Sequence, residues 1–184
     1  ILDDVIHVDT TAEGGILAGS NPRSVLFAVY RFLRENGCRW LFPGVDGEII
    51  PLKSINAVKY RHRASSRYRG PCIEGATSQD ILLDTIDFIP KTGMNMFMMQ
   101  FFVPSPFYDR YYNHEGSSTR PKESISTDTM LQWKTMCECE MQKRGIQFHD
   151  VGHGWTALPF GIDCTSGWSA VDDSIVPEES RKYL

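Results

Sequence analysis

The chain has 184 residues, of which 41% are hydrophobic and 23% are charged, a composition typical of a globular protein with a sizeable core. Its 19 basic and 23 acidic residues are interspersed and give a formal net charge of −4, which argues against nucleic acid or an anionic membrane surface as a partner. No apolar run is long enough for a transmembrane helix, so we expect no association with membranes. The chain begins at Ile1 and not at methionine, so we expect a processed protein or a fragment.

Residues 1–60 are predicted to form a small α/β domain. The segments 5–8 and 15–19 are strand candidates separated by a turn-like stretch, which favours a β-hairpin. Further short extended segments are expected at 38–42 and 48–51, the first of which is broken by a Pro-Gly pair. Together these segments predict a small sheet.

A helix is predicted between the hairpin and the later strands of this domain. Asn21 is a good N-cap, and Pro22 suits the first helical position. Apolar residues then recur at helical spacing until Gly37 supplies a stop. The pattern predicts one helix that lies across the sheet.

Basic residues are concentrated between residues 59 and 69, with Ser65 and Ser66 among them. We interpret this run as a solvated connection between two domains. The predicted domains are therefore residues 1–60 and residues 61–184.

From residue 67 onward, strand and helix patterns alternate. In chain order the pattern predicts a strand at 68–73, a helix capped by Thr77 or Ser78 and ended by Pro90 and Gly93, a strand at 94–103, a polar loop from 104 to about 124, a helix capped by Ser126 and ended by Gly145, and a strand at 146–151. This alternation predicts an α/β fold with a parallel sheet and right-handed crossovers.

Three strands are too few for a closed barrel, whose eight β/α units usually need ~250 residues. We therefore expect a small α/β sandwich domain followed by the first part of a (β/α)8 TIM barrel that is truncated before it closes. An open parallel sheet leaves an apolar edge, so self-association is also expected.

Polar residues gather where the third predicted strand ends. His149 and Asp150 close that strand, and His153 and Trp155 follow on either side of Gly154. Ligands of parallel α/β proteins bind at the carboxyl ends of the strands, so we expect a binding site here. The candidate substrate-binding residues are Arg69, Glu74, Gln100, His149, Asp150, His153 and Trp155, with Tyr108 or Tyr111 added from the polar loop. Aromatic rings that stack on sugars, beside side chains that bond hydroxyl groups, suit a glycan or oligosaccharide.

A metal site is the alternative reading of the same cluster. His149 and His153 have the spacing of a helical metal pair, and Asp150 is the candidate third ligand. Val151 and Gly152 favour a loop over a helix, and the Glu of the metalloprotease motif is missing. We therefore expect no metal and no cofactor, while a metal-dependent hydrolase on a TIM barrel stays open.

The five cysteines are predicted to be free thiols that fill the core, because their number is odd and Cys137-x-Cys139 is not a zinc spacing. They are Cys38, Cys72, Cys137, Cys139 and Cys164.

Two segments of the first domain carry a family resemblance. Residues 15–23 read Gly-Ile-Leu-Ala-Gly-Ser-Asn-Pro-Arg and lead into the predicted helix, and residues 37–44 read Gly-Cys-Arg-Trp-Leu-Phe-Pro-Gly. This order resembles the small domain that precedes the catalytic barrel in bacterial α-glucuronidase-like and β-N-acetylhexosaminidase-like proteins. The segments 86–88, 94–95 and 152–155 resemble the first three barrel units of that group.

The resemblance implies a glycoside hydrolase, secreted or periplasmic, that cleaves a glycan with two carboxylates, one of which protonates the leaving oxygen. It also implies that the acid follows a later barrel strand, so the catalytic pair is expected beyond this chain and no catalytic residue is assigned. On this view the chain alone is inactive. A non-catalytic carbohydrate-binding module is a further alternative.

Overall fold

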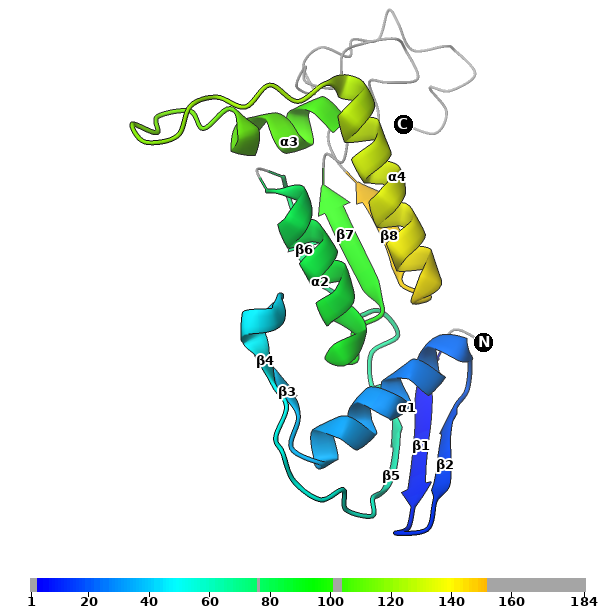
Figure 1. Cartoon of the computed structure of the whole chain (residues 1–184). Coiled ribbons are helices and arrows are strands. Elements are labelled where there is room, and N and C mark those ends of the chain that lie inside the picture. The colour runs from blue at the N-terminus through cyan, green and yellow to red at the C-terminus, as the bar shows by residue number, and fades with distance from the viewer. Residues whose placement is uncertain (1–2, 76, 101–103, 152–184) are drawn as a thin grey trace, which may run out of the picture.

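The computed structural model describes residues 3–75, 77–100 and 104–151 of the chain. A three-stranded antiparallel sheet with one helix is followed by a three-stranded parallel sheet with its own helices (Figure 1). The predicted α/β class is confirmed. Among the described residues, no helix combines the length and apolar character needed to cross a bilayer.

The first sheet is built on a hairpin of β1 (Val5–Thr10) and β2 (Gly15–Gly19), as predicted. The strands are antiparallel, with Thr10 opposite Gly15 at the turn. Inward side chains of β1 alternate with outward ones, so Ile6 and Val8 are buried.

The other edge of β1 pairs with β5 (Lys59–Arg63), which was predicted as a solvated connection. That prediction is wrong for these residues. Four of the five β5 side chains are exposed, and Tyr60 alone packs against the core of the first sheet, so the strand has a polar sequence. A basic outer strand of this kind discourages pairing with another chain. The strand also crosses the predicted boundary at residue 60.

The helix α1 (Pro22–Glu35) covers one face of this sheet. The Asn21 Oδ1 atom accepts a hydrogen bond from the Ser24 amide at 2.9 Å, so the predicted N-cap is confirmed. Phe27 and Ala28 turn inward and form the core of the first unit with Ile6, Val8 and Val58.

A separate antiparallel pair follows α1. It consists of β3 (Arg39–Trp40) and β4 (Glu48–Ile49), joined through the short 3-10 helix η1 (Val45–Gly47). The extended segment predicted at 38–42 is therefore shorter than expected, and it pairs outside the main sheet. Trp40 anchors the pair by meeting the ring of Tyr30 edge-on, with 5.2 Å between the ring centroids.

The second sheet contains β6 (Cys72–Ile73), β7 (Met96–Gln100) and β8 (Gln147–Val151) in that order. Both neighbouring pairs are parallel, which confirms the predicted direction of all three strands. Residues 101–103 of the predicted second strand lie outside the described residues.

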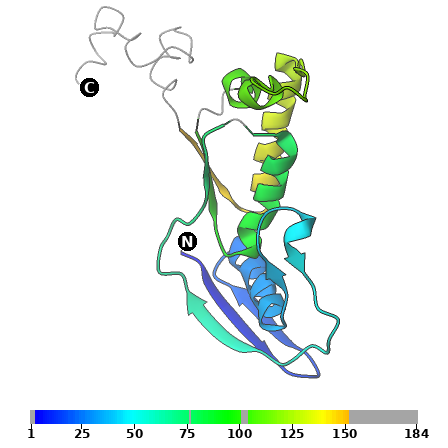
Figure 2. The same cartoon turned by 90° about the vertical axis from the view of Figure 1, so that its left-hand side faces the viewer.

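Two helices cross over between these strands. They are α2 (Gln79–Lys91), capped by Ser78, and α4 (Thr127–Lys143), capped by Ser126, so the Ser caps are confirmed. Pro90 lies inside the last turn of α2 and does not end it. Both helices pack on the same side of the parallel sheet (Figure 2).

The predicted polar loop from residue 104 begins with a helix, α3 (Pro104–Tyr112). The prediction was wrong because Phe107 and Tyr108 are fully buried and pack into the core under α4. The aromatic rings of α3 meet Trp133 of α4, with 5.3 Å between the centroids of Tyr108 and Trp133. Contacts with a distant helix, and not local periodicity, stabilise α3.

The described cysteines are all free thiols, as predicted. Cys38 and Cys137 are buried, whereas Cys72 and Cys139 are exposed, so the prediction that they fill the core is wrong for the latter two. Cys164 lies outside the described residues.

Candidate functional site

The two faces of the parallel sheet differ in what covers them. Ile73, Phe97 and Phe148 lie on the face that packs against α2, α3 and α4. Partners in parallel register share a face, so Cys72, Met98 and His149 form a row across the other face of the sheet. We call this row, together with Tyr68, the open face.

His149 is half-buried on the open face and lies beside Tyr68. Their rings meet edge-on, with centroids 5.9 Å apart and an angle of 66° between the planes. Tyr68 is 49% exposed, so one side of its ring is accessible to a ligand. Tyr68 was not predicted as a site residue, although its even spacing from Cys72 places both on one side of an extended segment.

The open face limits the chemistry that Cys72 and His149 can perform together. They lie on the two outer strands with Met98 between them, which separates their Cα atoms by ~9.6 Å. A thiol and an imidazole must be within hydrogen-bond reach to form a nucleophile and base pair. The row therefore suits ligand contact and not thiol catalysis.

The carboxyl edge of the sheet holds several of the predicted site residues. Glu74 directly follows β6 and is exposed, Gln100 ends β7, and Asp150 lies next to the end of β8. For Gln100 and Asp150 the structure describes the backbone alone. The parallel pairing places all three positions at the same edge.

Arg69 lies at the opposite edge. Its carbonyl oxygen accepts hydrogen bonds from the amides of Asn95 and Met96, at 2.8 and 3.1 Å, where β7 begins. Five residues of extended chain separate Arg69 from Glu74, a distance of roughly 16 Å. This corrects the prediction that both residues line one cleft, because β6 lies between them and Arg69 is beside the start of β7.

The Arg69 guanidinium is instead bound to Asp4, with 2.7 Å between Arg69 Nη2 and Asp4 Oδ2. The Asp4 side chain is 2% exposed. Its other oxygen accepts hydrogen bonds from Ser24 at 2.8 Å and from Arg23 at 3.0 Å, and Asn95 also donates to Oδ2 at 2.9 Å. A single carboxylate thus joins the first sheet and α1 to the start of β7.

The pKa of Asp4 reflects these contacts. Burial alone raises it, but hydrogen bonds from Arg69, Ser24, Asn95 and Asn21 outweigh burial and lower it from 3.8 to about 2. Asp4 is therefore ionised at neutral pH and serves as a structural anion. The sequence analysis did not identify it, because its partners are spread over 91 residues.

Tyr108, a candidate from the predicted loop, does not belong to the carboxyl-edge site. It is fully buried, and its hydroxyl donates to Gln79 Oε1 at 2.8 Å. Burial also raises the pKa of the neighbouring Cys137 thiol to about 11, so this thiol stays protonated. This cluster stabilises the packing of α2, α3 and α4.

His153 and Trp155 lie outside the described residues. Among the described residues, no group of three His, Cys, Asp or Glu side chains is arranged to hold a metal ion. Comparison with models of known protein families finds no match for the chain, and comparison with curated proteins finds none either.

Proposed function

We propose that this chain is the first part of a carbohydrate-active (β/α)8 barrel, preceded by a small α/β unit. The observation that carries the proposal is the order of the parallel sheet. Its three strands follow one another in chain order, and the helices between them cover one face only. In a (β/α)8 barrel the strands follow in chain order, the helices lie outside, and the other face turns toward the barrel interior.

The chemistry of the open face and the carboxyl edge supports a sugar as the ligand. Tyr68 offers an exposed aromatic ring, and His149 offers a half-buried hydrogen-bonding group beside it. Glu74 is exposed at the end of β6. Such a mixture of aromatic faces and polar groups suits the C–H faces and hydroxyl groups of a carbohydrate.

The proposed activity of the whole protein is glycoside hydrolysis by two carboxylates, at a secreted or periplasmic location. We assign no catalytic residue in this chain and expect the catalytic pair in later barrel units. The metal-dependent hydrolase and the non-catalytic binding module are the alternatives. Self-association through the outer strands of the parallel sheet stays a prediction of the same reasoning.

The proposal is tested by calorimetric titration of the purified chain, and of the full-length protein, with a panel of soluble oligosaccharides. We expect Tyr68→Ala to weaken binding by about 1–3 kcal/mol, the scale of removing a large apolar contact. His149→Ala should also weaken binding, whereas His7→Ala, on the exposed side of β1, should not.

Three results distinguish the proposed glycoside hydrolase from the two alternative functions. Unchanged affinity of a correctly folded Tyr68→Ala variant would remove the open face from the site. Stoichiometric zinc that is lost in His149→Ala would favour the metal-dependent hydrolase. Sugar binding by the full-length protein without cleavage of any aryl glycoside would favour the binding module.

A further inference from the structure

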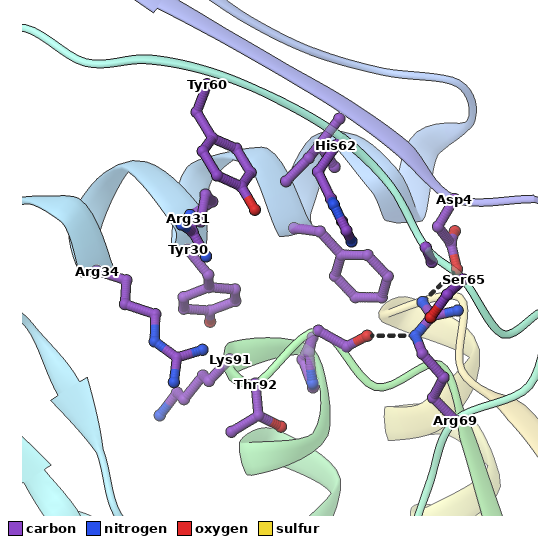
Figure 3. A pocket seen from close by; sticks show the side chains of 15 residues that line it. Asp4, Tyr30, Arg31, Arg34, Tyr60, His62, Ser65, Arg69, Lys91 and Thr92 are labelled. Atoms are coloured by element: carbon purple, nitrogen blue, oxygen red, sulfur yellow. Dashed lines mark hydrogen bonds and ion pairs between the residues drawn. The ribbon is translucent and has the colours of Figure 1, made fainter.

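A second candidate site lies between the first unit and the end of α2. A pocket of about 250 Å³ opens there, lined by α1, by β5 and by the turn that follows α2. Figure 3 shows Tyr60 and His62 on one side of this cavity and Lys91 and Thr92 on the other. The pocket is remote from the carboxyl edge, because Arg69 and Gly93 at the amino edge of the sheet line its floor.

Three aromatic rings, those of Phe27, Tyr30 and Tyr60, form part of the pocket wall. Phe27 is buried, and Tyr30 and Tyr60 are half-buried and line the cavity. Trp40 holds the Tyr30 ring edge-on, and the guanidinium of Arg31 stacks 3.7 Å from the centre of the Tyr60 ring. These contacts fix the rings before a ligand arrives, which reduces the entropy lost on binding.

Most of the charged side chains that line the pocket are cations. Asp4 is the one carboxylate among the lining residues, against the cations Arg31, Arg34, Arg69 and Lys91. Both oxygens of Asp4 already accept hydrogen bonds, including those from Arg69. Asp4 is therefore already engaged by its own neighbours, among them Arg69.

Most of these cations are already matched by acids. Lys91 pairs with Glu48 and Asp87, and Arg31 pairs with Glu35 at 2.5 Å. Arg34 is exposed at the last turn of α1, and within the described part of the chain its guanidinium makes no ion pair. Arg34 is thus the lining cation that has no carboxylate partner within the described residues.

A buried donor also lacks a partner. The Nε atom of Arg31 is shielded from solvent and has no hydrogen-bond acceptor within the described residues. Unpaired buried N–H groups are rare in folded proteins. Here the Tyr60 ring covers one face of the same guanidinium. Arg31 and Arg34 are three positions apart on α1, and both side chains line the same cavity.

The end of α2 also opposes an anion, because the carboxyl end of a helix is partly negative. Here the carbonyl oxygens of Ile89 and Pro90 already accept hydrogen bonds from the amides of Thr92, Gly93 and Met94. Lys91 lies at the same turn and is itself paired with Glu48 and Asp87. The helix end is therefore largely neutralised.

We propose that this pocket binds a small organic monoanion, a carboxylate carried on a single ring, with the carboxylate at Arg31 and Arg34 and the ring between Tyr30, Tyr60 and Phe27. A carboxylate matches the planar donor geometry of a guanidinium, and within the described residues Arg34 has no carboxylate partner of its own. A single ring fits the volume, which is slightly below the ~300–1,000 Å³ of pockets for drug-sized ligands. The proposal is independent of the glycan site on the open face.

The experiment uses the full chain and benzoate as the probe, with benzamide as its neutral match and inorganic phosphate as an ion without a ring. Binding is followed by calorimetry and by NMR shifts of the aromatic side chains. We expect benzoate to bind at millimolar concentration or below and to bind about tenfold more tightly than either comparison compound. Arg34→Gln should weaken benzoate binding about tenfold. The matched control is Arg61→Gln, which removes an exposed Arg of β5 that does not line this pocket.

Arg34 is exposed, so its replacement should leave the unfolding midpoint in urea unchanged, which separates lost binding from lost folding. Three results would overturn the proposal: no benzoate binding at millimolar concentration, equal binding of benzoate and benzamide or phosphate, or benzoate binding that Arg34→Gln leaves intact. Oligosaccharide binding should be unaffected by Arg34→Gln, so failure of this site and failure of the glycan site are distinguishable.

Discussion

The replacement of Asp4 by Asn tests whether one buried carboxylate holds the two units of the chain together. The change keeps the size of the side chain and removes its charge. It leaves Arg23 and Arg69, whose side chains are 9% and 21% exposed, without the anion that they share. It also places an amide group where only hydrogen-bond acceptors fit, because every neighbour of the carboxylate donates.

The expected loss follows from the pKa and from the burial of Asp4. Lowering the pKa from 3.8 to about 2 corresponds to about 2 kcal/mol of stability at neutral pH. Removal of one partner from a buried ion pair costs about 3–5 kcal/mol. Because Arg69 is partly exposed, we expect Asp4→Asn to lower the free energy of unfolding by about 2–4 kcal/mol at pH 7.

The sign of the pH dependence is fixed by the direction of the pKa shift. The folded chain depresses the pKa of Asp4, so this stability is fully present above pH 3.8 and is lost as the pH falls toward 2. The wild-type chain and Asp4→Asn should therefore differ at neutral pH and converge in stability below about pH 2.

Urea denaturation followed by circular dichroism at a series of pH values measures this difference. Asp3→Asn is the matched control, because Asp3 is the neighbouring residue and forms ion pairs with Arg63 and Arg67 at the surface. Surface pairs contribute little, so this variant should unfold near the wild-type midpoint. Equal stability of Asp4→Asn and the wild-type chain at pH 7 would refute the reasoning, as would a difference that persists in acid.

Two further changes probe the packing and the thiols. A Cβ atom at Gly70 would lie 1.9 Å from the carbonyl oxygen of Met96, so Gly70→Ala should destabilise the chain by about 3 kcal/mol in urea denaturation. The control is Gly116→Ala, whose Cβ meets no atom within 4 Å and which should cost only about 1 kcal/mol for its positive φ of 77°. Equal losses of stability in the two variants would show that the contact between Gly70 and Met96 does not cause the effect. In the native chain, iodoacetamide should modify Cys72, which is exposed, and should reach Cys137, which is buried with a raised pKa, only after unfolding. Peptide mass mapping measures both reactions, and native labelling of Cys137 would contradict the buried position.

Local chemistry made several elements predictable from the sequence. The caps at Asn21, Ser78 and Ser126 act within three residues, so their patterns are readable without knowledge of the fold. The alternation of apolar strands and amphipathic helices after residue 67 indicated parallel pairing, because parallel strands require a crossover between them. The carboxyl-edge position of Glu74 follows from the same alternation.

Tertiary structure decided the features that depend on distant partners. The basic strand β5 has no apolar pattern of its own, and its pairing with β1 is available only because β1 keeps a free edge. The helix α3 depends on Trp133, which lies far along the chain. Arg69 belongs to the start of the strand predicted at 68–73, and its contacts with Asn95 and Met96 show that this start lies at the amino edge of the sheet.

The two polar centres of the molecule were invisible in the sequence for the same reason. Asp4 bonds Arg69 and Asn95 across 65 and 91 residues, and no local periodicity records such a contact. The cationic pocket likewise combines α1, β5 and the end of α2. The sequence determines the elements through interactions between near neighbours, whereas buried charges and cavities depend on how those elements meet.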